Sequence, residues 1–286
     1  MTAAPPLPIV RSPAELRAAV AAWRAEGRTV GFVPTMGALH EGHLSLVRQA
    51  LQSADRVVAS VFVNPKQFAP TEDLDRYPRQ EARDAELLAG AGCALLFAPD
   101  ARAMYPEGFS TRILVGGPSQ GLETDFRPQF FEGVATVVAK LLIQAGADVA
   151  VFGEKDYQQL LVVRRLARDL DLPTEILAGP TARESDGLAM SSRNAYLSPE
   201  QRVIAGRLNH VLAEAAEKAR KGAAITAVKA WARGGLAAAG FDSVDYVEIR
   251  RADDLEPYAE DVVNAPARIL AAAWLGKTRL IDNLPV

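Results

Sequence analysis

The stretch VPTMGALHEGH, from Val33 to His43, decides how the first half of this chain is interpreted. It begins at the end of an apolar run and holds two of the three histidines in the sequence, His40 and His43. Gly37 and Gly42 bracket the first histidine, and glycine permits a tight turn or a close approach of the backbone to a ligand. The stretch therefore predicts a buried strand that leads directly into the N-terminus of a helix.

Apolar runs alternate with helical patterns on both sides of this stretch. Strands are expected at 29–33, 56–63, 94–98, 149–153 and 174–178, with 111–115 as a further candidate. Helices are expected after the capping serine Ser12 as far as Gly27, and at 43–54, 79–91, 131–145 and 157–170. Because the strands are continuous apolar runs, both faces of their sheet should be covered. The fold class predicted is α/β, a Rossmann-like, doubly wound parallel sheet.

The pattern changes after about Thr181. A loop rich in Ser, Gly and Arg comes first, then helical patterns at 199–221 and 225–239, then strand-like runs at 244–249, 267–274 and 278–284. Two helices followed by consecutive strands predict a smaller C-terminal α+β domain that carries an antiparallel sheet. The expected domains are therefore 1–181 and 182–286.

Composition excludes several classes of protein. The 286 residues are 49% hydrophobic and 23% charged, and the net charge of −3 comes without a basic stripe, so no nucleic-acid partner is expected. A single cysteine, Cys93, allows no intrachain disulfide and favours a reducing, cytoplasmic setting. The N-terminal residues lack a signal-peptide core. The most apolar segment, 133–151, contains Lys140 and Asp148 and predicts a buried helix and strand, with no membrane partner.

Three polar stretches follow predicted strands directly. They are MGALHEGH at 36–43, NPKQF at 64–68 and GEKDYQQ at 153–159. In an open parallel sheet, ligands bind beyond the carboxyl ends of the strands, where loops lead into helix N-termini. We therefore expect the three stretches to converge on one edge of the sheet.

The histidine pair suits phosphate, because a helix N-terminus offers free N–H groups and the positive end of the helix dipole. The alternative is that both histidines merely cap the helix. A zinc site is a third possibility, but HEGH lacks the HExxH spacing of zincins, and the third histidine, His210, belongs to the other predicted domain. No protein metal site is predicted.

The other stretches carry weaker signals. Lys155 and Gln159 are four residues apart and so should share a helix face, with the lysine suited to a phosphate oxygen. Gln67 and Gln159 could together hold a substrate with hydroxyl groups. The MSSRN stretch at 190–194 suits a polyphosphate and could close over a cleft. Each stretch also has a plainer interpretation, as an exposed helix cap, a surface residue or a flexible loop.

Taken together, these motifs resemble one family. The sequence resembles those of the pantothenate synthetases, or pantoate–β-alanine ligases. The stretches that carry the resemblance are, in order, VPTMGALHEGHLSLV, SVFVNPKQF, DLDRYPR, VFGEKDYQQL, DGLAMSSRNAYL and AAAWLGKTRLIDN. HxGH and the serine-rich loop alone resemble only the wider nucleotidyltransferase superfamily. The resemblance implies ATP-dependent condensation of pantoate with β-alanine to pantothenate, through a pantoyl adenylate, with release of AMP and pyrophosphate. It also implies Mg²⁺ with ATP, a homodimer, a nucleotide- and pantoate-binding domain at 1–181 and a lid at 182–286.

The same resemblance implies roles for individual residues. His40, His43 and Lys155 would be catalytic, acting on the transferring phosphate. Gln67 and Gln159 would hold pantoate, and Gln67 would also face β-alanine. ATP would be bound by Met36, Gly37, Ala38, Leu39, His40, Glu41, Gly42, His43, Gly153, Glu154, Lys155, Asp156, Ala182, Met190, Ser191, Ser192 and Arg193.

Two residues depart from the family pattern. Lys66 stands where methionine is common, and Phe130 where histidine is expected. Strand alternation predicts that Lys66 points away from Gln67 and the site. Two other functions are compatible with the same motifs. One is a cytidylyltransferase-like enzyme that keeps the nucleotide on its product, and the other is a regulatory protein that binds ATP without turnover.

Overall fold

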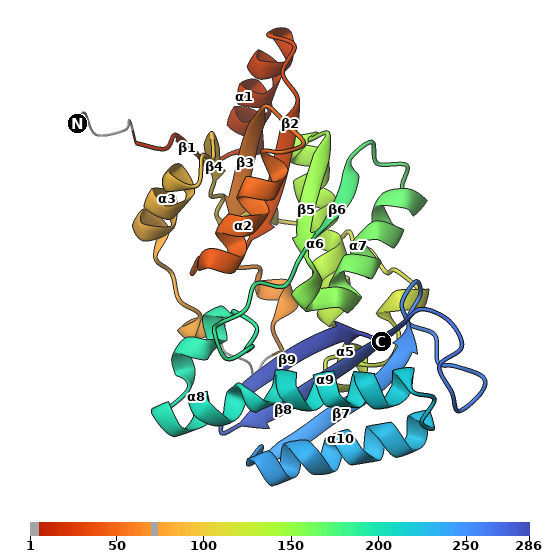
Figure 1. Cartoon of the computed structure of the whole chain (residues 1–286). Helices are drawn as coiled ribbons and strands as arrows, with labels where there is room; N and C mark the ends of the chain where they lie inside the picture. The colour runs from red at the N-terminus through yellow and green to blue at the C-terminus, as the bar shows by residue number, and fades with distance from the viewer. Residues whose placement is uncertain (1–5, 70–73) are drawn as a thin grey trace. The chain divides into compact units, whose positions relative to one another are not determined.

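A six-stranded parallel sheet organises one part of the molecule (Figure 1), in a computed structural model that describes residues 6–69 and 74–286. Asp73, the first residue of the DLDRYPR motif, lies outside the described residues. The strand order is β1-β4-β3-β2-β5-β6, and every pair is parallel. The strands are β1 (Ile9–Val10), β2 (Val30–Thr35), β3 (Arg56–Val61), β4 (Leu95–Phe97), β5 (Val149–Gly153) and β6 (Glu175–Gly179).

Helices cover both faces of this sheet. On one face, α2 and α3 pack on alternate strand residues such as Val33 and Val57. On the other, α6 contacts β2 and packs against α1, so Phe32 and Val58 are fully buried as well. The helices of this part are α1 (Pro13–Ala25), α2 (Glu41–Ala50), α3 (Glu81–Gly90), α4 (Ala101–Met104), α6 (Phe130–Ala145) and the later residues of α7 (Tyr157–Asp169).

The direction of the strand order reverses between β2 and β5. From β2 the chain builds outward through β3 and β4, whereas β5 and β6 are added on the other side of β2. Ligands of doubly wound sheets bind at such a switch point, beyond the carboxyl ends of the two strands. The histidine stretch follows β2 and the GEKD stretch begins at the end of β5, so both start at the carboxyl ends of the two strands that flank the switch point.

A three-stranded antiparallel sheet organises the second unit. Its order is β7-β8-β9, and α9 and α10 lie side by side on one face (Figure 1), where they share a buried cluster with Ile249 and Leu280. A smaller cluster with Tyr246 and Leu270 lies on the other face. The elements are α5 (Glu123–Phe126), α8 (Pro199–Ala205), α9 (Arg207–Arg220), α10 (Ile225–Ala239), β7 (Ser243–Arg251), β8 (Ala267–Leu275) and β9 (Thr278–Pro285).

The structure confirms the predicted fold class and corrects several elements. Residues 111–115 form no strand, although the segment was predicted as a candidate. The helix predicted at 199–221 is broken at Gly206, where a Cβ would lie 2.5 Å from the Asp186 carboxylate. The second unit also includes residues 116–126 and 155–161, which join Thr181–Val286. No helix in the described part of the chain is long and apolar enough to cross a membrane.

The buried core beside the parallel sheet contains the free cysteine, Cys93. Cys93 is 7% exposed, its thiol donates to the Val57 carbonyl at 3.3 Å, and burial raises the pKa of the thiol to about 11. At pH 8 this pKa leaves about one thousandth of the thiol ionised, and the thiolate is the reactive form.

We therefore predict that the native protein reacts very slowly with Ellman's reagent at pH 8, whereas the protein in concentrated urea releases one equivalent of thionitrobenzoate quickly. Raising the pH towards 11 should speed the native reaction as the thiolate forms. Rapid reaction of the native protein at pH 8 would contradict the burial of this thiol.

Candidate active site

The turn between β2 and α2 needs two left-handed residues. Gly37 has φ 84° and Ala38 has φ 52°. A Cβ on Gly37 would lie 3.0 Å from an oxygen of Asp84 and 3.0 Å from Val61, so both the backbone conformation and the space require glycine. Ala38 adopts a conformation that costs an L-residue about 1 kcal/mol or more, which neighbouring contacts must offset.

Asp84 on α3 supplies those contacts. Its carboxylate is 1% exposed and accepts the backbone N–H of Ala38 at 3.0 Å and that of Leu39 at 2.9 Å. Burial raises the pKa of Asp84 above its ordinary value, although these two hydrogen bonds act to lower it. Sequence reasoning missed this residue; the available signal was an aspartate on the helix face that also carries Leu88.

His40 and His43 cap the start of α2. Nδ1 of His40 accepts the Gly42 N–H at 3.2 Å, Nδ1 of His43 accepts the His40 N–H at 3.3 Å, and the ring centroids are 4.1 Å apart. A neutral imidazole that accepts at Nδ1 carries its proton on Nε2, so each ring presents an Nε2–H donor. The capping interpretation is confirmed, and the caps favour the tautomer with its proton on Nε2.

The structure corrects one part of the phosphate argument. Helix α2 begins at Glu41, two residues earlier than predicted, and the N–H groups of Gly42 and His43 are already bonded to His40. These two backbone donors are therefore already used within the helix start and do not support the predicted backbone contact to a phosphate. The side chain of Glu41 turns to Arg48, with N–O distances of 2.6 and 3.2 Å.

Gln67 lies in a 3₁₀ turn, η1 (Pro65–Gln67), that is held by Asn64. Asn64 is fully buried; its Oδ1 accepts the Lys66 N–H and the Tyr105 hydroxyl, and its Nδ2 donates to the Gly133 carbonyl and to Oε1 of Gln67. The backbone partners fix which end of the Asn64 amide is oxygen, and this in turn points the Gln67 oxygen at Asn64. The other end of the Gln67 side chain is then the amide nitrogen, which can only donate.

The two departures from the family pattern both lie beside this turn. Lys66 is in the 3₁₀ turn and not in a strand, so the alternation argument for its direction was wrong; its Nζ lies 5.0 Å from the Tyr105 ring centroid and 5.3 Å from that of Phe109. The guanidinium carbon of Arg127 lies 3.8 Å from the centroid of the Phe130 ring, and Arg127 donates to the Gln67 carbonyl at 3.0 Å. Phe130 thus supports a side chain that holds Gln67.

Lys155 lies in a second 3₁₀ turn, η4 (Glu154–Asp156), between β5 and α7. The prediction that Lys155 and Gln159 share one α-helical face was therefore wrong, because α7 begins only at Tyr157. Lys155 Nζ lies 3.6 Å from the Asp156 carboxylate, and its side chain is 22% exposed. A partly buried lysine at the end of a central strand remains well suited to a phosphate oxygen.

The adjacent glutamines of α7 differ in their surroundings. Gln158 is 4% exposed, accepts the Glu123 N–H at 3.1 Å, and donates to the carbonyls of Pro118 and Gly121. These backbone partners occupy both ends of its amide. Gln159 is half-buried and lies outside this arrangement, which favours it over Gln158 as a substrate ligand.

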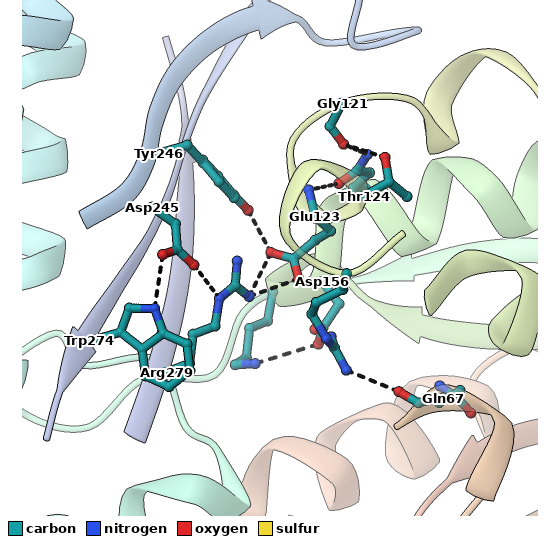
Figure 2. Close-up of polar contacts among 12 residues, drawn as sticks. Gln67, Gly121, Glu123, Thr124, Asp156, Asp245, Tyr246, Trp274 and Arg279 are labelled. Carbon is teal, nitrogen blue, oxygen red and sulfur yellow. Dashed lines mark hydrogen bonds and ion pairs between the residues drawn. The ribbon is translucent and has the colours of Figure 1, made fainter. Parts of the chain in front are cut away.

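A buried ionic network anchors the segment that Gln158 holds (Figure 2). Glu123 is 6% exposed, pairs with Arg279 at 2.8 and 2.9 Å, and accepts the Tyr246 hydroxyl at 2.8 Å. Asp245 accepts from the other side of the Arg279 guanidinium, at 2.7 Å, and from the Trp274 indole, at 2.9 Å. Removing one partner of such a pair typically costs about 3–5 kcal/mol, since it strands a buried charge.

The serine-rich stretch follows a short hairpin. Arg183 and Ala189 form an antiparallel β-bridge, and the Met190 N–H donates to the Ala182 carbonyl at 2.9 Å. Ser191 then caps a 3₁₀ turn, η5 (Ser192–Tyr196), by accepting the Arg193 N–H. Among residues 6–69 and 74–286, no group of three or more His, Cys, Asp or Glu side chains could hold a metal ion, and His210 lies on α9.

The sheet order, with the HxGH stretch at the switch point, defines a doubly wound α/β protein. The family model described as pantoate-beta-alanine ligase matches residues 8–285. The pantothenate synthetase of Caulobacter vibrioides is 63% identical over 279 residues, which are 97% of this chain and 98% of that one. This chain therefore belongs to the pantoate–β-alanine ligase family, a family of enzymes.

Solved structures agree with this assignment. The pantothenate synthetase of Thermus thermophilus is 49% identical, with a TM-score of 0.91 over 97% of this chain and 99% of that one. The pantoate-beta-alanine ligase of Francisella tularensis, complexed with beta-gamma ATP and beta-alanine, is 32% identical, with a TM-score of 0.81 over 97% of each chain. The predicted family and fold are confirmed, whereas these comparisons leave the roles of individual residues as predictions.

The turn that carries Gln67 depends on Gly133 of α6. A Cβ at Gly133 would lie 2.1 Å from the Lys66 carbonyl oxygen. We predict that Gly133→Ala lowers the free energy of unfolding by about 1–3 kcal/mol, measured by urea denaturation, because the helix or the turn must shift. Gly234→Ala in α10 is the matched control; a Cβ there meets nothing within 4 Å, so stability should rise by about 0.5–1 kcal/mol. Equal effects of the two changes would contradict this packing.

Proposed function

We propose that this chain condenses pantoate with β-alanine in two steps. The pantoate carboxylate attacks the α-phosphate of ATP, which forms pantoyl adenylate and expels pyrophosphate. The amine of β-alanine then attacks the acyl carbon, which forms the amide of pantothenate and expels AMP. The observation that carries the proposal is the histidine pair at the start of α2, where Nδ1 of each ring accepts a backbone N–H and the proton of a neutral ring is therefore on Nε2.

The first step builds charge on the α-phosphate oxygens and on pyrophosphate. Preorganised donors and cations stabilise that charge without a covalent nucleophile. We assign this role to His40, His43 and Lys155. The remaining contacts to ATP are proposed for Met36–Gly42, Gly153, Glu154, Asp156, Ala182 and Met190–Arg193. Mg²⁺ would accompany ATP and neutralise part of the charge on its phosphates.

Pantoate offers hydroxyls and a carboxylate, which amides can recognise. We propose that Gln67 and Gln159 hold it. The support for Gln67 is its fixed orientation, with the oxygen on Asn64 at 2.9 Å and the nitrogen as donor. The support for Gln159 is that its neighbour Gln158 is committed to backbone partners. Gln67 is also proposed to face β-alanine.

The test of the reaction is incubation of the purified chain with ATP, Mg²⁺, pantoate and β-alanine, with AMP and pantothenate both measured. Equimolar AMP and pantothenate are expected. A nucleotidylated product would instead identify a cytidylyltransferase-like enzyme, and ATP binding with no consumption would identify a regulatory protein.

We predict that His43→Ala slows pantoate-dependent exchange of labelled pyrophosphate into ATP, measured without β-alanine, by ~10²–10³-fold, because one preorganised donor to the α-phosphate is lost. ATP affinity should change much less. Chemically supplied pantoyl adenylate should still react with β-alanine at a near-normal rate, since that step does not need this donor.

The control for this variant separates capping from catalysis. His43→Gln can still accept the His40 N–H, because glutamine is the usual partner at this position of a capping box. The His43→Gln variant should keep the stability of the parent, and its rate of pyrophosphate exchange should fall as far as that of His43→Ala. Recovery of exchange in the glutamine variant would reduce His43 to a helix cap.

We further propose that the enzyme is a cytoplasmic homodimer, with residues 1–181 as the nucleotide- and pantoate-binding domain and 182–286 as a lid. The dimer is supported by apolar exposure: Leu114 is 78% and Ile143 is 55% exposed. Ile113 donates to Thr136 on α6 at 3.1 Å, which places the segment of Leu114 beside the helix of Ile143. Large exposed apolar side chains mark association surfaces when they gather.

We predict that Leu114→Lys shifts the protein from dimer towards monomer, measured by light scattering after size exclusion over a range of concentrations, since burying a lysine charge in an apolar interface is costly. Val203→Lys is the control, because Val203 is 73% exposed on α8 and has no part in the proposed contact. An unchanged dimer in Leu114→Lys would move the interface elsewhere.

A further inference from the structure

The proposed function leaves the C-terminal motif TRLIDN without a role. Its last two residues, Asp282 and Asn283, are consecutive in β9 and each is 3% exposed. Burying a carboxylate and an amide is costly unless both are fully paired. Their partners therefore indicate what the motif does.

Asp282 holds the hairpin that precedes the serine-rich stretch. Its two oxygens accept from Nη1 and Nη2 of Arg183 at 2.7 and 2.9 Å, and Asn209 of α9 donates to it at 3.3 Å. The same Arg183 guanidinium donates to the Gly187 carbonyl at 2.9 Å. One two-pronged ion pair thus fixes both sides of the hairpin, and Met190–Arg193 continues directly from it.

Asn283 holds the turn that carries Lys155. Its Nδ2 donates to the Lys155 carbonyl at 2.8 Å, and its Oδ1 accepts from Nε of Arg268 at 2.7 Å. A guanidinium can only donate and a carbonyl can only accept, so these partners fix the orientation of the amide. The guanidinium of Arg268 also lies over the Tyr157 ring, 4.0 Å from its centroid, in the first turn of α7.

The two side chains reach different partners because successive residues of a strand point to opposite faces of a sheet. Asp282 shares its face with Leu280 and the helix that carries Asn209. Asn283 shares its face with Ile281, which packs against the same cluster as Tyr157. A one-residue shift of β9 would exchange the two faces and lose both sets of contacts.

We propose that Asp282 and Asn283 are positioning residues for ATP, one for the Met190–Arg193 stretch and the other for Lys155. The proposal rests on the ATP-binding roles assigned above to those segments. Neither side chain touches the nucleotide; each acts by holding a backbone segment that does. The strand makes the two segments one rigid unit, because the anchors are adjacent in the chain.

The test compares three variants with the parent enzyme. Asn283→Asp keeps an oxygen that accepts from Arg268 but loses the N–H donor to the Lys155 carbonyl. Asp282→Asn loses one of the two oxygens that accept from Arg183, together with the negative charge of the carboxylate. Asp245→Asn is the control: it also weakens a buried arginine pair in the same sheet, with Arg279 (Figure 2), but has no bond to either ATP segment. ATP affinity is measured by titration calorimetry, KM for ATP and for β-alanine by turnover, and stability by urea denaturation.

Asn283→Asp and Asp282→Asn should each weaken ATP binding and raise KM for ATP by about tenfold, with KM for β-alanine within about twofold, as expected when one hydrogen bond to a buried partner is lost. Asp245→Asn should shift the urea midpoint at least as far and leave ATP affinity within about twofold. Parental ATP affinity in both β9 variants would overturn the proposal, as would an equal loss of ATP affinity in Asp245→Asn.

Two further outcomes separate this proposal from the proposed function. If the parent binds ATP but forms no pantothenate, the reaction assignment fails, and the calorimetric comparison still tests the positioning roles. If Asp282→Asn does not fold, Arg183→Lys replaces it, since lysine keeps the charge but loses the two-pronged contact; unchanged ATP affinity there would overturn the role of Asp282.

Discussion

The turn from β2 into α2 is governed by the need of its backbone N–H groups for acceptors. Five of them find acceptors within a few residues or on α3: Thr35 accepts from Gly37, Asp84 accepts from Ala38 and Leu39, and the two histidines accept from His40 and Gly42. An unpaired N–H in this buried place would cost as much as a lost hydrogen bond. Satisfying them produces the left-handed backbone, the helix start and the imidazole tautomer at once.

The same use of side chains recurs at the other segments of the site. Asn64 accepts the Lys66 N–H and donates to the Gly133 carbonyl, Arg127 donates to the Gln67 carbonyl, and Asn283 donates to the Lys155 carbonyl. In each case a polar side chain ties the loop to another part of the chain. Loops that bind ligands lack the regular ladders of helices and sheets, so their precision must come from such side chains.

Much of the architecture follows from local patterns. Ser12 caps its helix as predicted, within a capping box with Glu15, and β5 and α10 have the predicted bounds. The change from alternating strands and helices to consecutive strands near 181 identified two sheets of different kinds. Prediction failed at two segments whose neighbours are distant in sequence. Gly206 interrupts the predicted helix, and a Cβ there would lie 2.5 Å from the Asp186 carboxylate. Residues 111–115 run beside α6 without a strand partner among the described residues.

By itself, the sequence determined which residue types follow each strand, and hence the family, the histidine pair proposed to bind phosphate and the candidate amides. Only the tertiary structure separated Gln158, which holds Pro118 and Gly121, from Gln159 beside it, and only the structure revealed Asp84 and the division of labour between Asp282 and Asn283. The physical reason is that a side chain's chemistry is local, whereas its partner is set by chain segments distant in sequence. A buried polar group takes its role from that partner, and periodicity carries no record of it.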